Sequence, residues 1–175
     1  SPDLRPVVNL QGQEVFQYLK PWILVKGPKG IGAFHEYGQP ALPLEYEEIT
    51  TFTNRLLARK GTDYWIYEKS TGKTKWLGSA EEAKLTRNGQ VILKNQGSYY
   101  LPLSSTPEKA YELLLENQGD FLLAKEASGF GLINQFGEYV LDPVLDQLEP
   151  TRGDNYFGFD ENQYLLIRGF EASAQ

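Results

Sequence analysis

The chain has 175 residues and a formal net charge of −6, with no cysteine but eleven Tyr, nine Phe and three Trp. The absence of cysteine excludes disulfides, thiol catalysis and cysteine-ligated zinc, and the acidic charge argues against nucleic acid as a partner. No apolar run approaches the roughly 20 residues that cross a bilayer, so no membrane span is expected. The high aromatic content favours half-buried β surfaces. We therefore expect one all-β domain over residues 1–175. No cofactor is expected.

Short apolar runs that end on a basic residue recur along the chain. The basic residues are Lys26, Arg59, Lys94, Lys125 and Arg168, which lie 33, 35, 31 and 43 residues apart. A glycine follows each run closely, as a strand that enters a tight turn requires. A second strand is expected to begin at Ile31, Tyr64, Tyr99 and Phe130, at the same spacings of 33, 35 and 31 residues. These two markers predict repeated antiparallel β-hairpin or three-stranded units of about 33 residues.

The units follow one another in chain order, with a partial unit at each end. We expect the partial units at 7–16 and 156–169, and complete units at about 22–49, 56–83, 90–115 and 119–149. The first partial unit resembles the second half of a unit, and the last resembles its first strand. This permutation is compatible with an open curved array or with a propeller-like closed ring.

Two segments show helical signals within this β pattern. Thr106, Pro107 and Glu108 provide a cap, a first-turn proline and an early acid, and Tyr111 and Leu114 lie three residues apart. The segment 79–84 begins with the capping residue Ser79. We therefore expect one or two short helical insertions.

Two of the units share a longer pattern of glycine, proline and tail residues. The segments are Lys29–Phe34 with Gly38, Leu42-Pro43 and Tyr46–Ile49, and Gly129–Ile133 with Gly137, Asp142-Pro143 and Leu145–Leu148. They resemble the WG (KWG) repeat family of bacterial proteins, whose unit reads approximately as a strand, a Gly turn, Trp-Gly, a strand, Asp-x-x-Gly, Ile-Pro and a Tyr-Asp-x-Ile tail. The units around Tyr64-Trp65 and Tyr99-Tyr100 lack the family glycine, and the chain has no Trp-Gly dipeptide. The resemblance implies a β-repeat scaffold from a family without a common activity.

Aromatic and basic residues are the candidates for ligand binding. The aromatic candidates are Trp22, Tyr64, Trp65, Trp76, Tyr99 and Tyr100. Adjacent residues of a strand point to opposite faces, so at least one residue of the pair Tyr64-Trp65 and one of the pair Tyr99-Tyr100 can lie on a solvent face. There it could stack on a sugar, a peptide or a base, unless it is buried against a neighbouring unit. The recurring basic residues Lys26, Arg59, Lys94, Lys125 and Arg168 form a candidate cationic stripe for an anionic ligand. Alternatively, they pair with carboxylates and protect strand edges.

No catalytic or metal-binding constellation is recognised. His35 is the single histidine, and we expect a partly exposed residue at a strand end. Acids such as Glu47, Glu82 and Asp146 lie at unit tails, where turn geometry explains them, although two facing carboxylates would suffice for a glycosidase. The segment 154–162 lacks the pattern of an EF-hand calcium loop, and Arg-Gly-Asp at 152–154 suits an exposed turn.

These patterns predict a non-enzymatic binding or scaffold module for protein–protein or polysaccharide recognition. The alternatives are a carbohydrate-active hydrolase that uses a carboxylate pair and a structural spacer in a longer surface protein. A protein or a polysaccharide is the expected partner. An extracytoplasmic setting, in the periplasm or at the cell surface, is favoured over a cytoplasmic one.

Overall fold

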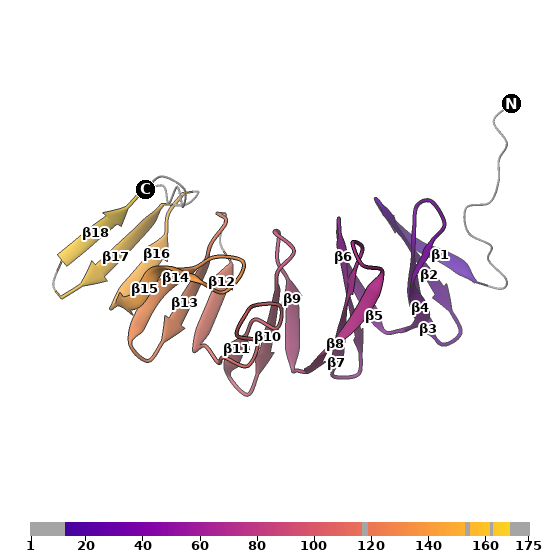
Figure 1. The fold of residues 1–175 in the computed structure, drawn as a ribbon, viewed down its shortest axis with the longest axis horizontal. Coiled ribbons are helices and arrows are strands. Elements are labelled where there is room, and N and C mark those ends of the chain that lie inside the picture. Colours follow the sequence, from indigo (N-terminus) through magenta and orange to yellow (C-terminus); the bar gives the residue numbers. More distant parts are fainter. Residues whose placement is uncertain (1–12, 117–118, 153–154, 162, 169–175) are drawn as a thin grey trace, which may run out of the picture. The chain divides into compact units, whose positions relative to one another are not determined.

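The computed structural model describes residues 13–116, 119–152, 155–161 and 163–168. Within them, the regular elements are β-strands that pair antiparallel in five separate sheets, and the sheets do not close into a barrel (Figure 1). The prediction of an all-β, antiparallel fold is confirmed. The chain divides after Ala80 into two compact units.

The first unit contains two four-stranded sheets, in which each strand pairs with the next along the chain. The first sheet consists of β1 (Glu14–Leu19), β2 (Trp22–Gly27), β3 (Gly30–His35) and β4 (Pro40–Tyr46). The second sheet consists of β5 (Glu48–Phe52), β6 (Arg55–Lys60), β7 (Asp63–Glu68) and β8 (Lys73–Ser79).

One apolar core joins the two sheets of the first unit. Leu24 and Ala33 of the first sheet and Leu56 and Ala58 of the second are buried in the same cluster. Leu56 and Ala58 are two residues apart on β6, so their side chains point to the same face of the sheet. Trp22 adds a polar link, because its buried indole donates from Nε1 to the carbonyl oxygen of Phe52 at 2.7 Å.

The second unit contains three sheets. The third sheet consists of β9 (Glu82–Leu85), β10 (Val91–Asn95) and β11 (Ser98–Tyr100). The fourth sheet consists of β12 (Leu113–Glu116), β13 (Leu122–Glu126), β14 (Gly129–Ile133) and β15 (Tyr139–Leu145). The fifth sheet consists of β16 (Gln147–Pro150), β17 (Tyr156–Asp160) and β18 (Gln163–Ile167).

The strand β13 at the centre of the fourth sheet is buried on both faces. Leu122 and Ala124 belong to the core shared with the third sheet, whereas Leu123 belongs to the core shared with the fifth. A strand that is covered on both sides needs apolar residues at successive positions rather than at alternate ones. This requirement explains the continuous apolar run at the start of β13.

The predicted helical insertions are wrong. Lys109 donates its backbone N–H to the Thr106 carbonyl in a turn, and Tyr111 then pairs with Tyr99 through two backbone hydrogen bonds of 2.8 and 2.9 Å. Ser79 ends β8, and the following residues enter β9. Strand pairing satisfies the backbone and buries the Tyr111 side chain, which outweighs the weak local capping signals. No helix that could span a membrane occurs in the described ranges.

The sheets begin one strand earlier than the expected units. The unit expected at 22–49 corresponds to a sheet over 14–46, and Ile49 already lies in β5. The partial unit expected at 7–16 lies outside the described residues from 7 to 12. The partial unit expected at 156–169 corresponds to β17 and β18, which complete the fifth sheet together with β16 rather than open a new one.

Two glycines are required where a bulged strand crosses its neighbour closely. Ile31 pairs with Tyr46, but Ala33 pairs with Leu42, so β4 carries extra residues that include Pro43. A Cβ atom on Gly32 would lie 2.7 Å from the carbonyl oxygen of Leu42. The equivalent Cβ on Gly131 would meet the Leu141 carbonyl beside Pro143. A side chain at either position would therefore displace backbone.

We predict that Gly32→Ala destabilises the protein more than Gly27→Ala does. The added methyl at position 27 would meet Leu44 Cδ2 at 3.0 Å, and this side-chain tip can move, whereas the atoms around Gly32 belong to the backbone. We expect a loss of roughly 1–3 kcal/mol for Gly32→Ala and less than about 1 kcal/mol for Gly27→Ala. Urea denaturation measures both, and equal losses would contradict the close-approach explanation.

Candidate functional site

The predicted aromatic residues lie in three different environments. Trp22 and Tyr64 are buried in the protein core. Trp65, Tyr99 and Tyr100 are half-buried in β7 and β11. Trp76 is 58% exposed on β8. The aromatic candidates thus include one indole that is more than half exposed and three rings that are partly exposed.

Four of the five predicted basic residues share one structural position, and each lies beside an acid. Lys26, Arg59, Lys94 and Lys125 lie on the second strand of their sheets, whereas Arg168 follows β18 and is exposed. The acidic neighbours on the preceding strand or its entry are Glu14 opposite Lys26, Glu47 and Glu48 at 2.8 and 3.2 Å from Arg59, Glu82 opposite Lys94, and Glu112 at 3.6 Å from Lys125. These carboxylates lower the positive potential that an anionic ligand would need.

His35 ends β3 as expected, but it is buried rather than partly exposed. Its side chain is 8% exposed, and its ring packs edge-on against Trp22 at a centroid distance of 5.6 Å. Nδ1 accepts a hydrogen bond from the backbone N–H of Tyr37 at 3.3 Å. His35 is paired with Trp22 in the register of β2 and β3, so its imidazole lies on the same face of the sheet as the buried indole.

The described residues hold no group of three or more His, Cys, Asp or Glu side chains that could bind a metal ion. Residues 156–160 of the oxygen-rich segment 154–162 form β17, while Asp154 and Asn162 lie outside the described residues. Gly153 and Asp154 of the Arg-Gly-Asp tripeptide also lie outside them.

A groove in the second unit runs along β12, opposite β9 and β10, and has a volume of about 210 Å³. Ligand pockets for small molecules usually measure about 300–1,000 Å³, so this groove accommodates one or two side chains rather than a whole ligand. It is lined by Glu82, Ala83, Lys84, Ile92, Lys94, Tyr99 and Leu113–Glu116. Lys94 and Tyr99 are paired across β10 and β11, and Lys94 Nζ lies 5.7 Å from the centroid of the Tyr99 ring.

The groove has an apolar floor and a rim of balanced charge. Ile92 and Leu114 are buried at its base, and Leu115 is 50% exposed beside it. Its four charged lining residues comprise two Glu and two Lys, which sum to zero. Lys84 and Glu116 form an ion pair across it at 3.7 Å.

Both strands that border the groove lie at sheet edges. β9 and β12 each pair with a single neighbour, β10 and β13 respectively. An edge strand offers backbone N–H and C=O groups to an incoming strand, and natural edges are usually protected by Lys, Pro or a bulge. β12 has the sequence Leu-Leu-Leu-Glu and contains neither Lys nor Pro.

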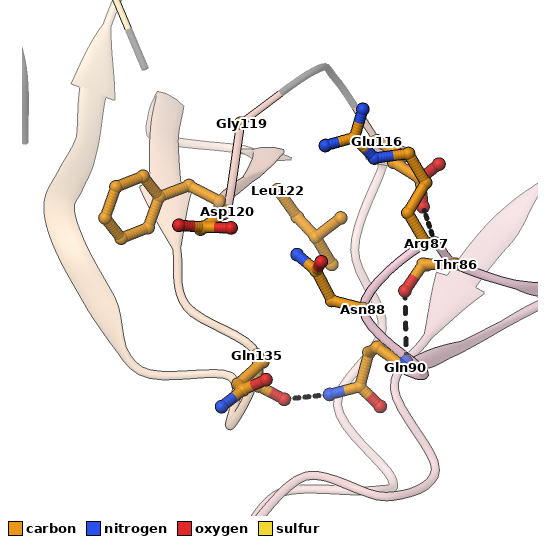
Figure 2. A pocket seen from close by; sticks show the side chains of 10 residues that line it. Thr86, Arg87, Asn88, Gln90, Glu116, Gly119, Asp120, Leu122 and Gln135 are labelled. Atoms are coloured by element: carbon orange, nitrogen blue, oxygen red, sulfur yellow. Dashed lines mark hydrogen bonds between the residues drawn. The ribbon is translucent and has the colours of Figure 1, made fainter. Parts of the chain in front are cut away.

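A smaller pocket adjoins the groove through Glu116 (Figure 2). Its volume of about 10 Å³ corresponds to about one water molecule. Glu116 Oε2 accepts from the Arg87 backbone N–H at 2.9 Å, and Gln90 donates its side-chain N–H to the Gln135 carbonyl. Thr86 Oγ1 accepts from the Gln90 backbone N–H at 3.0 Å. These polar groups hold a turn against neighbouring loops, and the space is too small for a substrate.

A second polar cluster fixes the segment before β12. Tyr139 donates its hydroxyl to Glu126 Oε2, and Lys109 Nζ lies 3.2 Å from Glu126 Oε1. The same ammonium lies over the Tyr111 and Tyr139 rings, at 5.1 and 5.0 Å from their centroids. Burial, followed by the hydrogen bond to Glu126, raises the pKa of Tyr139 far above its usual value. The cluster ties Lys109 to the fourth sheet and so positions the entry to β12.

Sequence reasoning did not single out Leu115, Lys84 or Glu116. The run Leu113–Leu115 was available as a signal of an apolar strand. Whether such a strand lies in the middle of a sheet or at its edge depends on pairings between distant residues, which periodicity does not reveal.

We predict that Glu116→Ala destabilises the protein more than Lys84→Ala. Removal of Glu116 leaves the Arg87 backbone N–H without this acceptor, which we expect to cost about 1–2 kcal/mol. Lys84 is 61% exposed, so removal of its ion pair should cost at most about 0.5 kcal/mol. Urea denaturation tests the difference, with Glu116→Gln as a control that retains an oxygen acceptor. Equal effects of Glu116→Ala and Lys84→Ala would contradict this role.

We also predict that the stability contributed by Tyr139 is lost in alkali. Its raised pKa keeps the folded side chain neutral while an unfolded Tyr ionises above about pH 10, so the contribution is complete below that pH and falls as the pH rises further. Tyr139→Phe should cost about 1–2 kcal/mol near pH 7, and its difference from wild type should shrink above about pH 10. Denaturation at both pH values measures this, and a constant difference would be contrary evidence.

No model of a known protein family matches this sequence, and no curated protein matches it. The likeness to the WG repeat family therefore rests on the residues quoted above and stays a prediction. The candidate site is defined by its own geometry: an exposed edge strand, an apolar floor and a rim without net charge.

Proposed function

We propose that this chain is a non-enzymatic binding or scaffold module that holds a protein partner through an extended segment placed along β12. The observation that carries the proposal is the half-exposed Leu115 on the edge strand β12, beside a groove of side-chain size. In β-strand addition, backbone hydrogen bonds supply affinity and pockets for alternate side chains supply selectivity.

The charges of the groove suggest which segment fits. Lys84 and Glu116 pair with each other, and Glu82 lies opposite Lys94 in the strand register. A charged peptide side chain would have to compete with these partners, whereas an aliphatic one would bury apolar surface on Ile92 and Leu114. The preferred partner segment is therefore extended and carries an aliphatic residue at the groove.

The scaffold in this proposal is a single WG-like repeat domain of about 33 residues per unit. An open curved array and a propeller-like ring are its two alternative arrangements. The face-to-face packing of antiparallel sheets within each compact unit supports a repeated layer as the building block. No comparable observation favours a hydrolase or a passive spacer.

The test is selection of 12-residue random peptides on the immobilised chain, followed by measurement of Kd for the enriched peptides. We expect aliphatic, β-compatible sequences to be enriched. Leu115→Lys should weaken their binding by roughly tenfold or more, because a lysine on β12 places a charge at the edge where the partner segment would pair.

The matched control is Val144→Lys. Val144 is 56% exposed on β15, the opposite edge strand of the same sheet. Thermal unfolding first confirms that both variants are folded. Failure to enrich any peptide, or an equal loss of binding in both variants, would refute the proposal.

A further inference from the structure

The first unit carries a second surface, centred on Trp76, with a different chemistry. We propose that Trp76, together with Trp65 and Asp63, forms a platform that binds a saccharide chain. This inference does not rest on the peptide groove, because its residues belong to β7 and β8 of the first unit.

The Trp76 indole is both exposed and held in place. Its side chain is 58% exposed, although it is a large aromatic residue that would gain by burial. Nε1 donates to Asp63 Oδ1 at 3.3 Å, which anchors one edge of the ring to the neighbouring strand. The bond restrains the indole at its edge, which lowers the ordering cost when a ligand stacks on its face.

Trp65 extends this surface toward the core. It lies directly opposite Trp76 in the register of β7 and β8, so the two side chains point to the same face of the second sheet. Trp65 is half-buried and packs against Tyr46 at a centroid distance of 5.5 Å. Its packing gives the platform a rigid inner side, while Trp76 forms the exposed outer side.

Polar groups lie beside the Trp76 indole. Asp63 Oδ1 accepts bonds from Trp76 Nε1 and from Ser79 Oγ, the latter at 2.6 Å. Among the described residues both bonds end on Oδ1, so the acceptor positions on Oδ2 face no protein donor. An ionised carboxylate has about four lone-pair sites, which leaves acceptors for ligand hydroxyls.

This combination matches a sugar better than a peptide. A pyranose ring presents an apolar C–H face that stacks on an aromatic face and hydroxyl groups at its edge that hydrogen-bond to a carboxylate. A peptide side chain would need an enclosed apolar pocket to gain comparable burial, and Trp76 instead lies on the open edge strand β8. The open arrangement also lets a long chain pass across the platform.

The experiment uses the full chain and three neutral polysaccharides, hydroxyethyl cellulose, xylan and galactomannan, in affinity gel electrophoresis. Tryptophan fluorescence titrations with the hexasaccharides of β-1,4-linked glucose, xylose and mannose give Kd values. We expect at least one polymer to retard the wild-type chain. Trp76→Ala should weaken that binding by roughly threefold to tenfold.

Two further variants separate stacking from simple apolar contact. Trp76→Phe should restore part of the affinity and Trp76→Leu should not, because only the former presents a flat aromatic face. Phe136→Ala is the control, since Phe136 is also 58% exposed but lies in the second unit, and it should bind as wild type does. Absence of retardation by all three polymers, or unchanged binding by Trp76→Ala, would overturn the proposal.

Discussion

The burial of apolar side chains between sheets that pack face to face is the constraint on which the structure depends. A single antiparallel sheet of three or four strands has two faces, and in water at least one of them must be covered. The first and second sheets share one core, and the fourth sheet shares one core with the third and another with the fifth. The apolar content of each strand follows from the number of its faces that are covered. β13 is apolar at successive positions for this reason.

Close packing also determines where side chains are excluded. The fourth strand of the first sheet and that of the fourth sheet bulge around a proline and approach the third strand closely. Gly32 and Gly131 occupy the approach points, where a Cβ atom would meet backbone atoms. In the second sheet the corresponding irregularity lies between Tyr64 and Trp65, and Trp65 keeps its side chain. The glycines at these two positions are therefore explained by the close approach of the backbone.

The surfaces proposed for binding arise where this packing stops. β12 and β8 lie at sheet edges, so their outer sides are not covered by a neighbouring strand. Leu115 and Trp76 consequently remain exposed, and in both places polar partners fix the surroundings: Glu116 with Lys84 at the groove, and Asp63 at the indole. The basic residues on the second strands behave differently. Each has a carboxylate as its neighbour on the preceding strand or its entry, which lowers the local positive potential.

The β class and the central hairpins of the sheets could be predicted from the sequence, because alternation, aromatic content and turn glycines are local properties. It also identified Trp76, Lys94 and Tyr99 as candidates. Tertiary structure decided which of the candidate aromatics were buried. Trp22 and Trp76 have the same side chain, yet Trp22 is buried and donates a hydrogen bond to the Phe52 carbonyl oxygen, whereas Trp76 is exposed.

Tertiary structure also overruled two local signals. The cap-like residues at 106–108 did not produce a helix, since Tyr111 gained a strand partner and burial, and His35 moved into the core beside Trp22. Edge position, groove shape and charge pairing depend on contacts between residues far apart in the chain. Local patterns contain no information about those distances, which is why the strands could be predicted from the sequence and the groove beside β12 could not.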